Sequence, residues 1–243
     1  MRTVTRDSIS LRGTGVISIV QQKKGHRFTL DSILLADFCR IKPRDKILEP
    51  GTGTGIISLL LAKKYAHVRI TAVEMQAALA DLCRQNINDN GLDDRIILLE
   101  QDIRTLKGEL KTSTFDVIVA NAPYTKSGAG RQSLHPERLA SRHDTGMDIV
   151  TWLDLGMFLK NKGRYFLVFP ANRLSELIYS LRIRRLEPKR IRLVHPYEVN
   201  PASMVLIEAV KSAGVGLDVL PPLIVHDADR EYTVEMRYIY DLH

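Results

Sequence analysis

Short apolar runs alternate with longer amphipathic segments through most of the chain. The short runs have the length and β-branched content of buried strands, whereas the longer segments repeat apolar positions roughly every three to four residues, as helices do. We predict strands at 46–50, 69–75, 95–102, 115–124 and 164–170, and helices at 56–66, 76–91, 149–163 and 175–186. Two further strands, expected to be antiparallel, follow at 189–196 and 203–212. Because strands that alternate with helices form parallel sheets, the pattern predicts an α/β, Rossmann-like fold with a mostly parallel seven-stranded sheet and helices on both faces.

The two ends of the chain lie outside this alternation. β-Branched residues flank Gly13 and Gly15, which predicts a hairpin over 8–21, and a helix is expected over 31–40 with Asp31 as its N-cap. The polar stretch 125–144 has no apolar period and predicts a loop. No linker divides the chain. We therefore expect one domain, with a hairpin and cap helix at 1–44, a Rossmann-like core at 45–212 and C-terminal additions at 213–243.

A glycine-rich turn follows the first strand of the core. It reads Glu49-Pro-Gly51-Thr52-Gly53-Thr-Gly55 and leads directly into a helix. Glycines here allow the backbone to turn sharply and to approach a ligand without interference from Cβ atoms. Their alternate spacing differs from the dinucleotide fingerprint, and the preceding acid suits a ligand with an ammonium group. These residues favour S-adenosylmethionine as the cofactor.

Two more acidic residues end the next two predicted strands. Glu74 is placed to accept hydrogen bonds from ribose hydroxyls, and Met75 to pack on an adenine ring. Asp102 is placed to reach the adenine amino group, with the backbone N–H of Ile103 beside it. Two alternatives stay open: Glu74 and Asp102 are only helix caps, or the domain binds a nicotinamide dinucleotide.

The fourth strand ends in Asn121-Ala122-Pro123-Tyr124, at the edge of the sheet where ligands bind in such folds. A base or amide NH₂ is a poor nucleophile because its lone pair is delocalised. Acceptors that hold its protons out of plane, here the Asn121 side chain and the Ala122 carbonyl, favour its attack on a sulfonium methyl. Pro123 stiffens the turn and Tyr124 offers a face for stacking. Asn121 also borders the predicted cofactor site, and an ordinary Asn-X-Pro turn is the alternative.

Composition and charge restrict the partner. The 243 residues are 44% hydrophobic and 26% charged, which is globular rather than disordered composition. The longest apolar run, 56–62, is too short to cross a bilayer, and no secretory signal begins the chain, so we expect a cytoplasmic protein without membrane contact. The net charge of +7 favours a polyanion as partner. Neither the histidines nor Cys39 and Cys83 have metal-ligand spacing, so we expect no metal and two buried thiols.

Taken together, these motifs resemble the amino-methyltransferases with an Asn-Pro-Pro-Tyr motif, and within them the bacterial tRNA1(Val) adenine-37 N6-methyltransferase family. The segments that carry the resemblance include HRFTLDSILLADF (26–38), ILEPGTGTGIISLLLA (47–62) and VIVANAPY (117–124). Ala122 departs from the motif, but the acceptor at that position is a backbone carbonyl. The resemblance implies a class I methyltransferase that acts on adenine N6 at position 37 of the tRNA anticodon loop. It also implies that Arg27, Thr29 and Asp31 lie near the cofactor.

Basic residues after the motif and near the C-terminus are the expected tRNA contacts. We predict that Arg131, Arg184, Arg185 and Arg190 bind phosphates, with a solvated surface as the alternative. The protein is expected to be a monomer or a weak homodimer. Other functions stay open at this point: a guanine-N2 RNA methyltransferase, a small-molecule O- or N-methyltransferase, a non-catalytic binding module, or a dehydrogenase.

Overall fold

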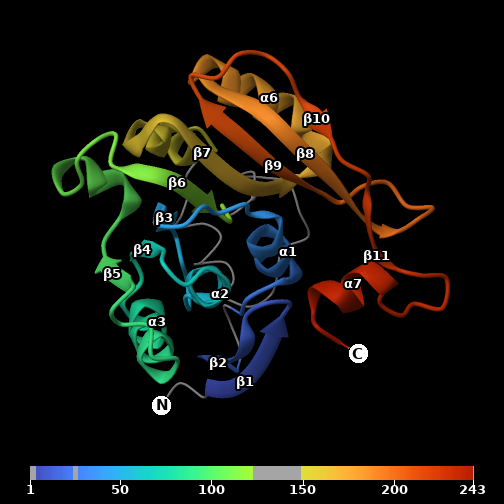
Figure 1. Cartoon of the computed structure of the whole chain (residues 1–243), viewed down its shortest axis with the longest axis horizontal. Coiled ribbons are helices and arrows are strands. Elements are labelled where there is room, and N and C mark those ends of the chain that lie inside the picture. Colours follow the sequence, from blue (N-terminus) through green and yellow to red (C-terminus); the bar gives the residue numbers. More distant parts are fainter. Residues whose placement is uncertain (1–3, 24–26, 123–148, 243) are drawn as a thin grey trace, which may run out of the picture.

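A computed structural model describes residues 4–23, 27–122 and 149–242 and contains the expected sheet (Figure 1). Within the described residues the sheet has nine strands, two more than predicted. The strands are β3 (Lys46–Pro50), β4 (Arg69–Glu74), β5 (Ile96–Glu100), β6 (Phe115–Ala120), β7 (Leu159–Pro170), β8 (Leu186–Tyr197), β9 (Met204–Lys211), β10 (Asp218–Val219) and β11 (Leu223–His226). The two additional strands, β10 and β11, are short and pair with the outer edge of β8.

In the middle of the sheet, the side on which the chain adds successive strands changes. It runs β8-β9-β7-β6-β3-β4-β5, and within it β9 alone is antiparallel to its neighbours. From β3 the chain adds strands outward on one side, through β4 to β5, and then on the other side, through β6 to β7. Ligands in open α/β sheets bind at such a switch point, at the carboxyl ends of the strands. Here that point lies between β3 and β6.

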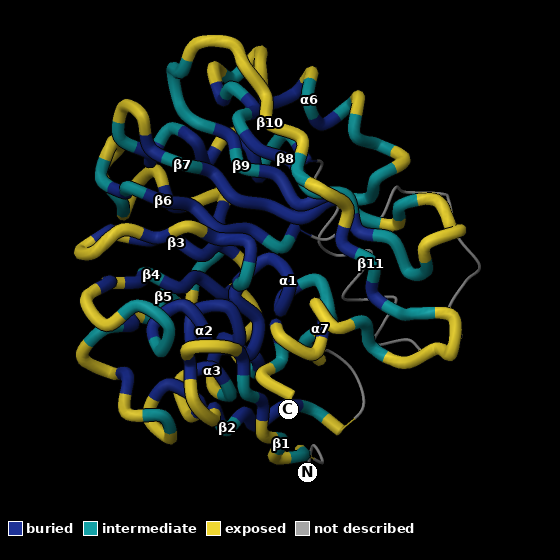
Figure 2. Tube along the Cα trace, turned by 45° about the vertical axis from the view of Figure 1, so that its right-hand side comes forward, coloured by how far each residue is buried: buried dark blue, intermediate teal, exposed yellow. Residues whose placement is uncertain are grey.

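Helices cover both faces of the sheet, so the protein has three layers with an apolar core on each side of the sheet (Figure 2). On one face lie α1 (Leu30–Phe38), α2 (Ile56–Lys64), α3 (Ala77–Asp89) and α7 (Val234–Ile239). On the other lie α5 (Ile149–Asp154), α6 (Leu174–Ile183) and the short 3₁₀ helices η1 (Ile103–Gly108) and η2 (Leu155–Phe158), with η3 (Ala171–Arg173) leading into α6. The first core takes residues from the hairpin, the central strands and the C-terminal helix, which ties both ends of the chain to the same sheet.

The predicted hairpin is formed by β1 (Val4–Leu11) and β2 (Gly15–Gln22), which make a separate sheet. Asparagine side chains of α3 occupy the outer edge of β2. The Asn86 amide accepts from the Val20 N–H at 2.6 Å and donates to the Val20 carbonyl at 2.9 Å. Asn90 does the same at Ser18, at 3.1 and 2.7 Å. The two asparagines thus replace a neighbouring strand and fix the hairpin against α3.

The helix predicted over 149–163 is wrong in its second half. It ends at Asp154 and passes through the 3₁₀ turn η2 into β7, which begins at Leu159. Leu159 pairs with β6, and Lys160 forms a 2.6 Å ion pair with Asp116 on that strand. Lys162 takes a left-handed φ of 62° that no helix accepts. Pairing with the sheet therefore outweighs the helical period of this segment.

Smaller differences concern element ends. The N-cap of α1 is Thr29, so Asp31 lies in the first turn rather than at the cap. Helix α6 ends at Ile183, and the next strand begins at Leu186, earlier than predicted. None of the described helices is long and apolar enough to cross a membrane.

Candidate active site

The predicted site residues converge on the switch point between β3 and β6. β3 pairs in parallel with both β4 and β6, in registers whose continuation sets Gly51 level with Glu74 on one side and Asn121 on the other. Adjacent strands are ~4.8 Å apart. The glycine turn, the acid of the second strand and the asparagine of the motif therefore occupy three neighbouring strand ends.

The glycine turn has a backbone that only glycine adopts without strain. Gly51, Gly53 and Gly55 have φ of 66°, 60° and 90°. A Cβ on Gly51 would lie 2.6 Å from Cη2 of Trp152, and one on Gly55 would lie 2.8 Å from the Cys83 sulfur. Both spacings are shorter than side chains tolerate, so the turn packs closely against α5 and α3. Cys83 is fully buried, as the sequence predicted.

Glu74 is buried and is bound to the glycine turn. Its Oε2 accepts from the Gly53 N–H and its Oε1 from the Gln76 N–H, both at 2.9 Å. These two bonds orient the carboxylate beside the glycine turn. The hydrogen bond from Gly53 connects Glu74 to the glycine turn. A residue that served only as a helix cap would not need this bond.

Glu49 is a buried carboxyl next to the turn. The hydroxyl of Ser58 on α2 donates to its Oε2. Burial raises the pKa of Glu49 to about 7, against the lowering effect of the Ser58 hydrogen bond. Both charge states are therefore accessible near neutral pH, and a cation bound beside Glu49 would favour the carboxylate.

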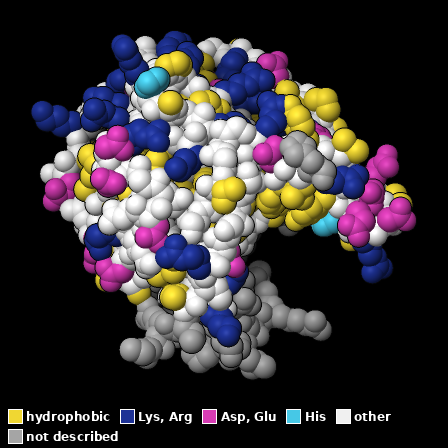
Figure 3. Space-filling model, turned by 60° about the horizontal axis from the view of Figure 1, so that its bottom comes forward, with side chains coloured by type: hydrophobic (Ala, Val, Ile, Leu, Met, Phe, Trp, Pro, Cys, Tyr) yellow, Lys and Arg dark blue, Asp and Glu magenta, His cyan; other side chains and the backbone are white. Residues whose placement is uncertain are grey.

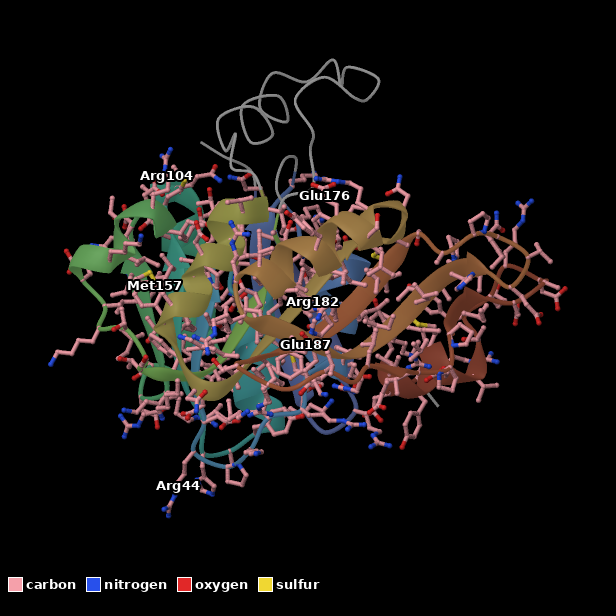
Figure 4. The ribbon with its side chains drawn as sticks, turned by 90° about the horizontal axis from the view of Figure 1, so that it is seen from above. Arg44, Arg104, Met157, Glu176, Arg182 and Glu187 are labelled. Atoms are coloured by element: carbon pink, nitrogen blue, oxygen red, sulfur yellow. The ribbon has the colours of Figure 1, made fainter. Side chains whose placement is uncertain are left out.

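Asp102 is a helix cap, and its contact with the adenine amino group stays a prediction. It is the N-cap of η1: its Oδ1 accepts from the Arg104 N–H at 2.9 Å and its Oδ2 from the Arg104 Nε at 2.8 Å. Hydrogen bonding from Arg104, which points outward at the surface (Figure 4), lowers the pKa of Asp102. The side chain of Ile103 is buried in the core, while Met75 is 40% exposed beside Glu74.

Asn121 contacts the cap helix α1. Its Nδ2 donates to the Ser32 Oγ at 2.9 Å, and Ser32 is 5% exposed. The neighbouring Ala122 is buried, whereas Pro123 and Tyr124 lie outside the described residues. Sequence reasoning missed Ser32. Its signal is a serine in a helix whose other buried residues are apolar.

Arg27 and Asp31, which the resemblance places near the cofactor, lie beside the hairpin and in α1. Arg27 donates to Thr5 Oγ1 and pairs with Asp7, both at 3.0 Å, which ties it to the hairpin. Asp31 is partly buried in the first turn of α1, and desolvation raises its pKa.

The predicted tRNA contact at Arg190 is wrong, because its side chain is inside the protein. Arg190 pairs with Glu208 at 2.8 Å, donates to the Phe38 carbonyl at 2.8 Å and stacks 4.0 Å from the centre of the Phe38 ring. Arg190 as a whole is only 7% exposed. It therefore anchors the C-terminal end of α1.

Arg184 and Arg185 lie far from the switch point. They connect α6 to β8, and β8 runs in the same direction as β6, so both lie at the edge where these strands begin. Asn121 lies at the opposite edge, about 20 Å away for a strand of β6's length. Arg184 is also paired with Asp154 at 2.8 Å, while Arg185 is exposed. Both are thus too far from Asn121 to reach a base held there, and Arg131 lies outside the described residues.

Other basic side chains of this segment are also partnered. Arg182 pairs with Glu187 at 3.3 Å, and the two lie side by side in Figure 4. Arg192 binds Glu235 at 2.7 Å. On the face drawn in Figure 3, lysines and arginines are interspersed with acids rather than gathered into one patch. Four of the six basic side chains at 182–192 therefore pair with carboxylates in the fold.

Buried polar atoms around these strand ends fit a polar ligand. Gln101 Oε1 and Trp152 Nε1 are buried without a hydrogen-bond partner among the described residues. The Gln101 backbone N–H donates to the Glu74 backbone carbonyl at 3.0 Å, and Trp152 packs on Gly51. An unsatisfied buried polar atom costs roughly 1–3 kcal/mol, which a ligand with donors and acceptors would recover. Within the described ranges no group of His, Cys, Asp and Glu side chains could hold a metal ion.

Known proteins similar to this chain are methyltransferases. Residues 47–149 match the family described as a methyltransferase domain. A tRNA1(Val) (adenine(37)-N6)-methyltransferase of Haemophilus influenzae is 30% identical over 217 residues, which cover 88% of this chain and 90% of that protein. The enzyme of the same description from Porphyromonas gingivalis is 29% identical over 222 residues, 86% of this chain and 85% of the relative.

Solved structures agree on the fold. An O-methyltransferase predicted in Agrobacterium tumefaciens superposes with a TM-score of 0.71 at 21% identity, covering 87% of this chain and 96% of that one. A SAM-dependent O-methyltransferase of Thermotoga maritima gives 0.54 at 20% identity, over 79% of this chain and 69% of its own. The predicted fold class, a Rossmann-like class I methyltransferase, is confirmed.

Proposed function

Because the chain belongs to the family of tRNA1(Val) adenine-37 N6-methyltransferases, we propose that it methylates N6 of adenine 37 in a tRNA anticodon loop, with S-adenosylmethionine as the methyl donor. The observation that carries the proposal is the shared position of Asn121 and the glycine turn. The two are neighbours at the switch point of the sheet, in registers that set Asn121 beside Gly51.

The residues around the glycine turn are suited to hold the cofactor. When bound, S-adenosylmethionine supplies an electrophilic methyl group on a sulfonium centre. Glu74, which the Gly53 and Gln76 N–H groups orient, accepts hydrogen bonds from the ribose hydroxyls. Glu49 balances the charge of the ammonium group as a carboxylate. Exposed Met75 packs on the adenine ring.

Asn121 and Ala122 prepare the nucleophile. The Asn121 Oδ1 and the Ala122 carbonyl accept the two protons of the adenine amino group and hold them out of the ring plane. The nitrogen lone pair then localises and points toward the methyl group. No strong base is required, because the attacked carbon bears a cationic leaving group and the methylated nitrogen loses its extra proton to water afterwards. Catalysis therefore consists mainly of alignment at this corner.

A labelling experiment tests the function directly. The protein is incubated with methyl-labelled S-adenosylmethionine and total tRNA from a strain that lacks its gene, and the labelled nucleoside is identified and mapped. We expect N6-methyladenosine at position 37 of tRNA1(Val). Labelled N2-methylguanosine would contradict adenine as the target, and label confined to small molecules would exclude tRNA. Protein carrying Asn121→Ala is the matched negative control.

Replacing Glu74 with alanine should weaken cofactor binding by at least ~100-fold. Hydrogen bonds to a charged carboxylate contribute roughly 1.5–3 kcal/mol each, and the ribose provides two donors. The affinity for S-adenosylhomocysteine is measured by calorimetry and by fluorescence of Trp152. This residue is the chain's single tryptophan and packs on Gly51, so its emission responds to the cofactor site.

Asp94→Ala provides the control for this change, because that carboxylate is 76% exposed and pairs only loosely, at 3.9 Å, with Arg95. Thermal unfolding of both variants separates loss of affinity from loss of the Gly53 hydrogen bond. Equal affinity in the Glu74 variant and wild type would remove Glu74 from ribose recognition.

A further inference from the structure

Ser32 is a buried polar side chain in an apolar helix. Helix α1 buries Ile33, Leu34, Leu35 and Phe38 against the sheet, and Ser32, in its first turn, is buried with them. Burying a hydroxyl among apolar side chains is unfavourable unless it is hydrogen-bonded. Its partner is the side-chain amide of Asn121, 89 residues later in the chain.

In the structure the Asn121 amide faces Ser32 with its nitrogen. The Asn121 Nδ2 is the donor and the Ser32 Oγ the acceptor, 2.9 Å apart. Because the two terminal atoms of a planar amide point to opposite sides, engagement of Nδ2 by α1 turns Oδ1 away from α1. An amide rotated by half a turn would instead present donors to an incoming amino group, which itself has only donors to offer there.

The helix that carries Ser32 is fixed at its other end. Arg190 binds the Phe38 carbonyl and stacks on the Phe38 ring, and that ring packs edge-on against Phe166 of β7, with centroids 6.2 Å apart. Lys64 of α2 pairs with Asp37 at 2.9 Å. Ser32 therefore lies on a helix that is held in place at its C-terminal end. A residue that positions another side chain must itself be fixed in this way.

We propose that Ser32 is a positioning residue that holds the Asn121 amide with its oxygen toward the target amino group. The proposal rests on the proposed function, in which Asn121 Oδ1 accepts a proton of that group. Ser32 does not touch the substrate in this account. It raises the fraction of enzyme in which the acceptor is correctly oriented, and so acts on the rate of methyl transfer rather than on binding.

The test compares Ser32→Ala, Ser32→Thr, Asn121→Ala and the Ser32→Ala/Asn121→Ala double variant, with Ser180→Ala as a matched control. Ser180 is likewise buried in a helix, but in α6 on the other face of the sheet. For each protein, kcat and KM for tRNA, the affinity for S-adenosylhomocysteine and the thermal midpoint are measured.

We expect Ser32→Ala to lower kcat about 10-fold, the equivalent of one hydrogen bond of roughly 1.4 kcal/mol. KM and cofactor affinity should stay within twofold of wild type, and Ser32→Thr, which keeps the hydroxyl, should recover most of the rate. In the Asn121→Ala background the same change should have no further effect, because the group that Ser32 orients is gone.

Several results would overturn the proposal: unchanged kcat in Ser32→Ala, a rise in KM alone, a loss equal to that of Ser180→Ala, or an undiminished effect of Ser32→Ala in the Asn121→Ala background. Failure of the proposed function is a separate outcome. It would appear as wild-type protein that forms no N6-methyladenosine, or as an Asn121→Ala variant with full activity.

Discussion

Asn121→Ala is expected to lower kcat for tRNA methylation on the order of 100-fold while leaving the affinity for S-adenosylhomocysteine within about twofold. Removal of one preorganised hydrogen-bonding group at a reacting centre typically costs this much or more. The side chain lies at the end of β6 next to the glycine turn, and its contact with Ser32 gives its amide a fixed orientation. Single-turnover rates with labelled cofactor measure the loss of chemistry apart from product release.

Asn161→Ala is the control for this prediction, since Asn161 is exposed on β7 at the opposite edge of the sheet. It should leave kcat unchanged. If Asn121→Ala turned over at the wild-type rate, the acceptor role would be wrong. If it instead lost cofactor affinity with kcat intact at saturation, Asn121 would belong to the cofactor site, the second role that the sequence suggested for it.

The arrangement of strand ends could be predicted from the sequence because it follows from local order. Each core strand is a short apolar run, and the residues directly after such runs meet at one edge of a parallel sheet. Gly51, Glu74 and Asn121 therefore come together without knowledge of any long-range contact. Positive φ at the glycines follows from the same turn.

Partners of charged and polar side chains could not be predicted in this way. Arg190 and Arg185 are both basic residues in one short run, yet the first is buried against Glu208 and the second is exposed. Their difference depends on contacts with β9, 18 residues away, and with α1, 152 residues away. The contact between Ser32 and Asn121 joins residues that are 89 positions apart in the chain, so the local pattern does not predict it. Residues 159–163 likewise form a strand because they pair with β6, although the spacing of their apolar residues predicts a helix.

Arg190→Gln is expected to lower the free energy of unfolding by about 3–5 kcal/mol, the usual cost of breaking a buried ion pair by removing one partner. The change leaves the Glu208 carboxylate buried without its guanidinium, and it removes the donor to the Phe38 carbonyl and the cation over the Phe38 ring. Urea unfolding followed by circular dichroism measures the loss. At temperatures where the variant is folded, the salt dependence of tRNA binding should match that of wild type, because Arg190 reaches no phosphate.

Arg185→Gln separates this role from a general effect of charge. Arg185 belongs to the same basic run but is exposed, so its replacement should change the free energy of unfolding by no more than about 0.5 kcal/mol. A small stability loss in Arg190→Gln together with a flatter salt dependence of tRNA binding would restore Arg190 as a phosphate contact. Replacement of Arg190 and Glu208 together by methionine and leucine should recover much of the stability, since apolar residues of similar volume often substitute for a buried ion pair. If the Arg190/Glu208 double variant is stable but still methylates slowly, the slow rate would result from loss of the anchor of α1. The displaced position of Ser32, rather than low stability, would then be its cause.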